Sequence, residues 1–312
     1  MTTTRRFFRV MLGAKSAHSD HCKAEGFIGA DFGIRQDLTG SLPENWRDFN
    51  KEFIPIFLGN RPEKTKVAAG LACGMLHTIC KGAAIGDVIL APDGSGSYLV
   101  GEVSGDYHYA PDDILPHRRN VHWRTETLSK EEMSDGLRNS AGSIGTVSNI
   151  SKHSDELERL IKGESTRVSV SDESVEDPSV FALEKHLEEF LIANWKSCEL
   201  GKTHDLYEDD GEVIGQQYPT DTGFIDILAI SKDRKELLVV ELKKGRASDS
   251  VVGQIQRYMG YLIDEVAEKD QTVRGCIVAL DNDLRIQRAL QINPTIDFYR
   301  YEVKFKLHKV DS

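Results

Sequence analysis

Two acids and a lysine lie in apolar runs of the C-terminal half, where they can bind a metal ion together. Asp226 stands in Gly-Phe-Ile-Asp-Ile-Leu-Ala-Ile, and Glu241 and Lys243 stand in Leu-Leu-Val-Val-Glu-Leu-Lys. Side chains two residues apart on a strand share one face, so Glu241 and Lys243 point the same way. Charged groups among Val, Ile and Leu are costly unless they are paired or metal-bound. The pattern predicts a divalent cation held by one carboxylate from each strand.

Such a site has the chemistry of a metal-dependent phosphodiesterase. Carboxylate oxygens suit Mg²⁺ or Mn²⁺, which we expect as the cofactor. The metal would activate a water molecule and stabilise the charged phosphate, and Lys243 would orient or deprotonate that water. Gln254 and Tyr258 follow one helical turn apart, where they can position Lys243 or a phosphate. Each motif taken singly is commonplace, since a Glu-Leu-Lys at a strand end is usually a solvated ion pair.

The elements around these residues predict a compact α+β layer. We expect helix, three strands, helix, strand, helix and strand over 179–195, 213–218, 223–231, 236–243, 249–268, 273–280, 283–291 and 296–305. The N-terminal half predicts a strand over 5–11, helices over 44–57 and 62–80, a hairpin over 86–105 and a closing helix over 150–162. The domains are therefore residues 1–162, a linker at 163–177 rich in Ser, Asp and Glu, and residues 178–312.

The ordered motifs resemble the PD-(D/E)xK nuclease superfamily, specifically the Mrr-like restriction enzymes and the NucS/RecB-type branch with its QxxxY element. The resemblance implies that Asp226 and Glu241 bind the metal and that Lys243, Gln254 and Tyr258 complete the catalytic site. It also implies a helix glutamate as a third ligand, which Glu184 matches. Glu188 and Glu189 lie on the same predicted helix and can take its place. Ile225 stands where the family name has a proline.

The N-terminal half contains the segments Gly86-Asp-Val-Ile-Leu and His117-Arg-Arg-Asn-Val-His-Trp. In these segments it resembles the PUA/EVE-like β-barrel modules, with helices, that are attached to Mrr-like enzymes and read modified bases. A flipped base needs aromatic faces and polar groups at its edge. The alternative is that the aromatics are core and the arginines lie in a solvated loop. The candidate base-binding residues are Asp31, Trp46, Tyr107, Tyr109 and Trp123. The candidate phosphate contacts are Arg118, Arg119, Lys244 and Arg257.

The balance of charge argues only weakly against a nucleic-acid partner. The net charge is −11, but metal ligands themselves add negative charge. Five cysteines without a framework of spacings indicate reduced thiols, and we expect a cytoplasmic protein with no membrane segment.

These features predict a Mg²⁺-dependent DNA endonuclease that restricts foreign, base-modified double-stranded DNA. We expect it to act as a homodimer formed through the nuclease domain. One alternative is a NucS-like repair nuclease specific for mismatched or branched DNA. The other is a non-catalytic nucleic-acid-binding protein built on a nuclease fold.

Overall fold

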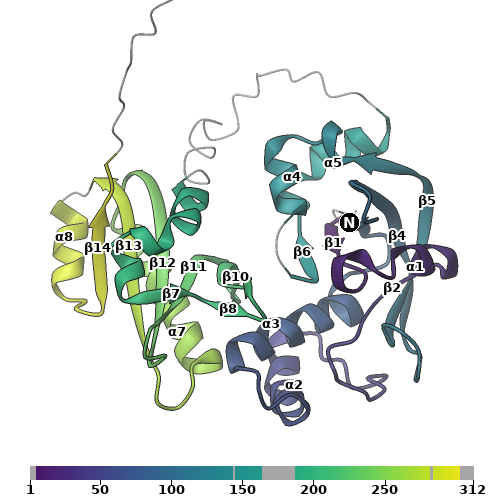
Figure 1. Cartoon of the computed structure of the whole chain (residues 1–312), viewed down its shortest axis with the longest axis horizontal. Helices are drawn as coiled ribbons and strands as arrows, with labels where there is room; N and C mark the ends of the chain where they lie inside the picture. The colour runs from purple at the N-terminus through teal and green to yellow at the C-terminus, as the bar shows by residue number, and fades with distance from the viewer. Residues whose placement is uncertain (1–4, 143–144, 164–186, 282–283, 303–312) are drawn as a thin grey trace, which may run out of the picture. The chain divides into compact units, whose positions relative to one another are not determined.

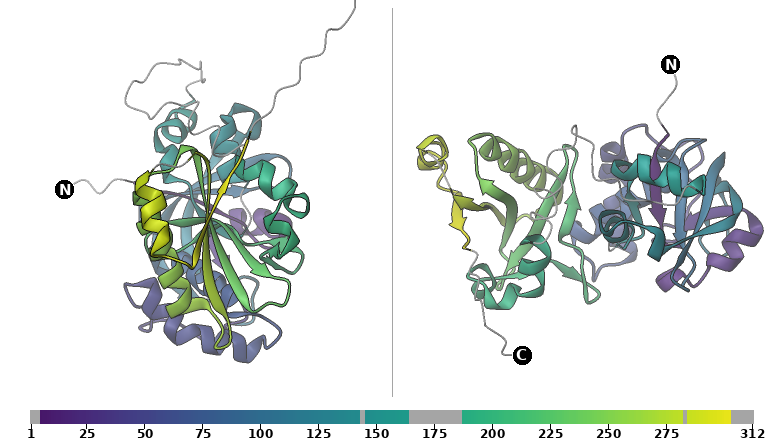
Figure 2. Two further views of the ribbon diagram at one scale, coloured as in Figure 1. Left: turned by 90° about the vertical axis from the view of Figure 1, so that its left-hand side faces the viewer. Right: turned by 90° about the horizontal axis from the view of Figure 1, so that it is seen from above.

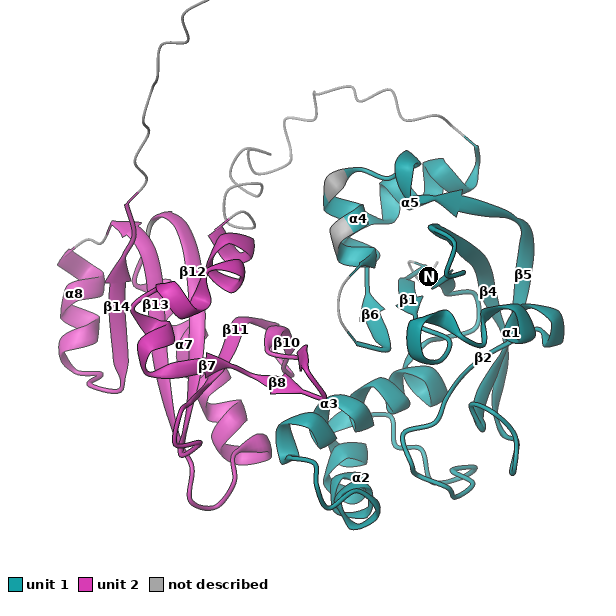
Figure 3. Ribbon diagram, in the orientation of Figure 1, with its two compact units in different colours: residues 1–171 teal, residues 172–312 magenta. Residues whose placement is uncertain are grey.

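The chain folds into two compact units, residues 1–171 and 172–312 (Figures 1 and 3). The computed structural model describes residues 5–142, 145–163, 187–281 and 284–302. The boundary between the units falls within the predicted linker, which lies outside the described residues from position 164 onward. Both units combine sheets with helices, so the predicted α+β class is confirmed.

Unit 1 is built on a six-stranded sheet in the order β2-β5-β4-β3-β1-β6. Its neighbouring strands are antiparallel except β1 and β3, which are parallel. The strands are β1 (Phe7–Val10), β2 (Phe27–Ala30), β3 (Val88–Pro92), β4 (Ser97–Tyr109), β5 (His117–Ser129) and β6 (Val147–Asn149). The helices are α1 (Ser19–Glu25), α2 (Trp46–Asn60), α3 (Lys66–His77), α4 (Asp135–Ala141) and α5 (Ser154–Ile161).

Helices α2 and α3 begin at residues suited to cap them. The Asn45 side chain accepts a hydrogen bond from the Arg47 N–H, and the Thr65 side chain accepts one from the Ala68 N–H. The single helix predicted over 62–80 ends as an α-helix at His77 and continues as a wider π-type turn over Thr78–Gly82.

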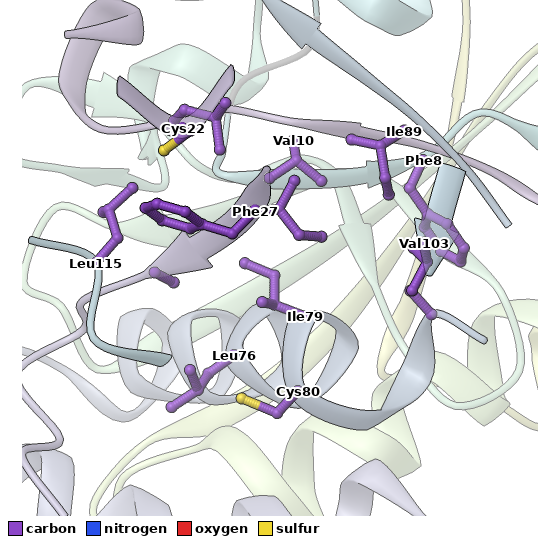
Figure 4. Close-up of a cluster of buried hydrophobic side chains, with 14 of the residues drawn as sticks. Phe8, Val10, Cys22, Phe27, Leu76, Ile79, Cys80, Ile89, Val103 and Leu115 are labelled. Atoms are coloured by element: carbon purple, nitrogen blue, oxygen red, sulfur yellow. The ribbon is translucent and has the colours of Figure 1, made fainter. Parts of the chain in front are cut away.

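Successive side chains along a strand point to opposite faces of the sheet, and in unit 1 both faces are apolar. On one face, Phe8, Val10 and Phe27 pack with Leu76 and Ile79 (Figure 4). On the other face, strand residues pack against helices α4 and α5. That second cluster includes Phe7, Val88, Leu90, Tyr98, Val100, Leu137 and Leu157. Helices therefore cover both sides of the sheet.

Unit 2 has a sheet in the order β10-β11-β12-β13-β14, with β7 also paired to β11. Strands β11 and β12 are antiparallel, whereas β12, β13 and β14 run parallel. A separate two-stranded hairpin, β8 with β9, was not predicted, and neither was β7. The strands are β7 (His204–Leu206), β8 (Glu208–Asp209), β9 (Glu212–Val213), β10 (Gln216–Pro219), β11 (Phe224–Ser231), β12 (Glu236–Arg246), β13 (Thr272–Asp281) and β14 (Ile296–Arg300). The helices are α7 (Ser250–Tyr261) and α8 (Leu284–Gln291), with a further helical segment at 187–193.

Helices lie on opposite faces of the sheet in unit 2 (Figure 2). The segment 187–193 packs on the face that carries Val240 and Leu242. Helix α7 covers the other face, where Ile255 and Met259 come so close to Gly275 that a side chain there would clash. Glu241 and Lys243 alternate with Val240 and Leu242, and so they share the face with α7. Among the described residues, no helix is both long and apolar enough to span a membrane.

Candidate active site

Strands β11 and β12 separate where the predicted acids lie. Their paired ladder ends at Ile227 and Val240, while β12 continues beside β13. Beyond this point a side chain replaces a backbone acceptor, because Asp226 Oδ2 accepts a hydrogen bond from the Leu242 N–H at 2.8 Å. The carboxylate of Asp226 is thereby held against the strand that carries Glu241.

Glu241 and Lys243 form a close ion pair on one face of β12. Lys243 Nζ lies 2.8 Å from Glu241 Oε1. Glu241 is 1% exposed, and a buried carboxylate is costly without a compensating charge. The Lys243 side chain is 30% exposed, so it is only partly shielded from solvent. The predicted acid and lysine are therefore brought together.

Helix α7 brings the two residues of the QxxxY element to the same end of the sheet. Gln254 Nε2 donates to Tyr258 Oη at 3.3 Å. A Cβ atom on Gly223 would lie 2.6 Å from that hydroxyl oxygen, and Gly223 has φ +148°. Only glycine leaves room for Tyr258 at the turn that leads into β11, three residues before Asp226.

A buried glutamate on the first helical segment is linked to this site. Glu188 accepts hydrogen bonds from Gln216 Nε2 at 2.7 Å and from Gln217 Nε2 at 2.6 Å. The same Gln217 nitrogen donates to Asp226 Oδ1 at 3.1 Å. Glu188 is buried and Glu189 exposed, while Glu184 lies outside the described residues. Sequence had offered Glu188 only as a substitute for Glu184, and it gave no signal for either glutamine.

The chemistry of the donor set fits a hard divalent cation. Asp226 and Glu241 supply carboxylate oxygens from adjacent strands, and Mg²⁺ binds through one or two carboxylates while keeping several waters. No group of three or more His, Cys, Asp or Glu side chains suited to a metal occurs within the described ranges. Asp226 and Glu241 are accordingly the residues that would hold the ion.

The two candidate phosphate contacts of unit 2 lie in different settings. Arg257 is exposed on α7, directly before Tyr258. Lys244 is half-buried near the end of β12, and its carbonyl oxygen accepts a hydrogen bond from the Tyr301 hydroxyl. Arg257 is thus the more accessible of the two for a nucleic-acid backbone.

Arg118 and Arg119, for which a phosphate role was predicted, are both buried. Arg118 lies over the Phe27 ring at 3.9 Å and pairs with Asp113 at 2.8 Å. Its guanidinium also donates to two backbone carbonyls of the preceding turn. Arg119 donates to three carbonyls, those of Gly105, Cys80 and Ala83. Both arginines therefore join segments of unit 1.

Tyr107 and Tyr109 of the predicted base pocket lie together around His117. Their ring centroids are 6.0 and 5.2 Å from that of the histidine. Tyr107 Oη contacts His117 Nδ1 at 3.0 Å and accepts a hydrogen bond from the Leu38 N–H at 3.1 Å. Burial raises the pKa of Tyr107 and lowers that of His117. Tyr107 and His117 thus fix the loop that contains Ile34 and Leu38 to the sheet.

The other three candidates for base binding contact different elements. Trp123 Nε1 donates to the Cys22 carbonyl of α1. Trp46 is half-buried and faces Gly74 of α3. Asp31 is exposed and accepts a hydrogen bond from the Gly33 N–H within its own turn. A base-reading role for these five residues stays a prediction.

Comparison with protein families divides the chain as the two units do. Residues 184–303 match the family model described as the endonuclease NucS C-terminal domain. Residues 8–151 match a domain of unknown function, DUF8426. The matched C-terminal range contains Asp226, Glu241, Lys243, Gln254 and Tyr258. The Mrr-like and PUA/EVE-like resemblances stay predictions.

Two individual proteins that are similar to this chain are also endonucleases NucS. Endonuclease NucS of Methanocaldococcus jannaschii is 36% identical over 75 residues, which are 24% of this chain and 27% of that protein. Endonuclease NucS 2 of Halobacterium salinarum is 25% identical over 67% of this chain and 71% of its own length. A repair endonuclease from Pyrococcus abyssi aligns with a TM-score of 0.31 and 15% identity, over 68% of this chain and 66% of that chain. The C-terminal part of this chain, which carries the candidate site, is similar to the C-terminal domain of endonuclease NucS.

Proposed function

We propose that this protein is a metal-dependent DNA endonuclease whose site is formed by Asp226, Glu241 and Lys243. The observation that carries the proposal is the junction of β11 and β12, where a fixed aspartate adjoins a buried glutamate paired with a lysine. This junction lies within the range similar to the NucS C-terminal domain. The non-catalytic alternative leaves these charged groups on an apolar sheet without a purpose.

The residues of the site have separate tasks in this reaction. Asp226 and Glu241 would hold Mg²⁺ or Mn²⁺, which when bound would supply Lewis acidity and an activated water. The Lys243 ammonium group, close to Glu241 and open to solvent, orients the water and offsets charge on the phosphate. Gln254 and Tyr258 donate hydrogen bonds that position the phosphate or Lys243. Arg257, on the exposed side of α7, contacts the DNA backbone.

We propose a NucS-like action on mismatched or branched DNA rather than restriction of modified DNA. The family model and both curated relatives are endonuclease NucS, which favours this alternative. Arg118 and Arg119, two of the phosphate contacts predicted for unit 1, donate to backbone carbonyls within the fold. DNA as the partner is part of the proposal.

The test is cleavage of four duplexes that share one sequence: fully paired, mismatched, branched and cytosine-modified. Each is incubated with Mg²⁺, Mn²⁺ or Ca²⁺, or with EDTA, and Glu241→Gln serves as the inactive control. We expect cleavage of the mismatched or branched duplex with Mg²⁺ or Mn²⁺, and binding with little cleavage in Ca²⁺. Preferential cutting of the modified duplex would favour restriction. Activity that survives EDTA would exclude the metal mechanism.

A further inference from the structure

Gln217 has an unusual backbone at the edge of the candidate site. It lies in β10 between Gln216 and Tyr218, which pair with Ile227 and Ile225 of β11. Its φ is +48°, in the left-handed region that residues other than glycine seldom adopt. Such backbone strain persists where surrounding contacts require it. In Gln217, these are the contacts of its side chain with two carboxylates.

The Gln217 amide nitrogen bridges two carboxylates. It donates to Glu188 Oε2 at 2.6 Å and to Asp226 Oδ1 at 3.1 Å. A side-chain amide nitrogen has two hydrogens, one for each acceptor. The reverse orientation of the amide would direct its carbonyl oxygen at two negative groups, so the chemistry fixes the orientation. One neutral side chain therefore holds two negative charges in place.

The bridge completes the fixation of Asp226. Its Oδ2 is held by the Leu242 N–H of β12 and its Oδ1 by Gln217 of β10, on opposite sides of β11. Each carboxylate oxygen has two lone pairs, so an oxygen that accepts one hydrogen bond can still bind a cation. A ligand that is already oriented loses less conformational freedom on binding.

We propose that Gln217 is a positioning residue of the metal site, which orients Asp226 and ties it to buried Glu188. This inference rests on the proposed function, because it takes Asp226 to be a metal ligand. It explains why the chain keeps a strained backbone at this one position of β10. It also couples the helical segment 187–193 to the site through a hydrogen bond rather than through a charge.

Gln217→Met tests the proposal, because methionine keeps the length of the side chain and removes both donors. Gln216→Met is the matched control, since Gln216 Nε2 donates to Glu188 at 2.7 Å from the neighbouring position. Mn²⁺ is titrated into the full chain without DNA, and free Mn²⁺ is followed by electron paramagnetic resonance. We expect about tenfold weaker Mn²⁺ binding in Gln217→Met, the size of a hydrogen bond to a charged group, and less than about twofold in Gln216→Met. Raising Mn²⁺ should restore the cleavage rate of Gln217→Met.

Gln217→Asn is the second variant, because asparagine tolerates the left-handed backbone but is too short to reach both carboxylates. It should show the same loss of Mn²⁺ affinity. Wild-type affinity in Gln217→Met and Gln217→Asn would overturn the proposal, and so would an equal loss in Gln216→Met. A wild-type chain that binds Mn²⁺ but cuts no DNA would refute the proposed function alone. A wild-type chain that binds no Mn²⁺ would refute both.

Discussion

At the scale of single residues, Lys243 combines a buried partner with access to solvent. Its ammonium group lies 2.8 Å from Glu241 Oε1, while its side chain is 30% exposed. The lysine neutralises a carboxylate that is otherwise costly to bury, and it can also meet a phosphate that arrives from solvent. An uncharged residue at this position would lose both contributions.

We therefore predict that Lys243→Ala lowers the single-turnover cleavage rate about 10²- to 10³-fold at saturating Mg²⁺, since charge on the phosphate loses its cation. The measurement uses the DNA substrate that the wild type cuts best, with circular dichroism to verify the fold. Lys232→Ala is the control, because this lysine is exposed in the turn between β11 and β12, and it should stay close to wild type. Full activity in Lys243→Ala would remove this lysine from the mechanism.

At the scale of elements, Arg119 of β5 joins segments that are far apart in the sequence. Its guanidinium donates to Gly105 at the middle of β4, and to Cys80 and Ala83 at the turn after α3. Burial lowers the pKa of this arginine, while the nearby carboxylates of Asp106 and Asp87 act in the opposite direction. The residue thereby fixes a helix end to the sheet.

We predict that Arg119→Ala destabilises unit 1 by about 2–4 kcal/mol, because buried carbonyls lose their donor and a cavity remains. Urea unfolding of the full chain measures the change, and Arg124→Ala, at an exposed position of β5, is the control. DNA affinity of the folded Arg119→Ala chain should equal that of wild type. Unchanged stability with weakened DNA binding would restore the phosphate role for Arg119.

The contact of β5 with the loop before α2 predicts a dependence of stability on pH. His117 Nε2 contacts the Ile34 carbonyl at 2.5 Å and therefore donates, while Nδ1 accepts from the Tyr107 hydroxyl. This arrangement suits the neutral ring, in which one nitrogen donates and the other accepts. Burial lowers the pKa of His117, against smaller raising effects from the Ile34 carbonyl, Asp31 and Asp37.

A folded-state pKa below the unfolded value of about 6.5 means that protons bind the unfolded chain more tightly. The stabilisation from neutral His117 is thus complete above about pH 6.5 and is lost as the pH falls toward the folded-state pKa, by up to ~1.4 kcal/mol per pH unit. Urea unfolding at a series of pH values should show this slope, and His117→Gln should reduce it. The remaining slope belongs partly to His77, whose pKa is also lowered by burial. An unchanged slope in His117→Gln would contradict the prediction.

The elements also show which parts of the site could be read from sequence. The alternation of apolar residues predicted β11 and β12, and with them the approach of Asp226 to Glu241, because strand pairing follows a period of two. The bridge through Gln217 could not be predicted, since it depends on a left-handed backbone and on packing of a distant helix. The burial of Arg119 could not be predicted for a similar reason: its partners lie far away in the sequence, and a basic pair in a polar strand resembles a solvated surface.

At the scale of the whole molecule, the chain has two units with different family matches and one candidate site. The site lies within residues 184–303, similar to the NucS C-terminal domain, and the other unit matches a domain of unknown function. In the proposed reaction, one set of Asp226, Glu241 and Lys243 would cut one DNA strand in each binding event. Concerted cutting of both strands would therefore need two chains.

We predict a homodimer that makes double-strand breaks, and mixing active with inactive chains tests it. Glu241→Gln keeps the shape of the buried side chain and removes the metal-binding charge. Random pairing at equal amounts gives active, mixed and inactive dimers in the proportions 1:2:1, so double-strand breaks should fall to about a quarter while mixed dimers produce nicks. Sedimentation on and off DNA measures the assembly state. The yield of double-strand breaks could instead fall only to half, in proportion to the fraction of active chain. That result would show that each chain acts alone.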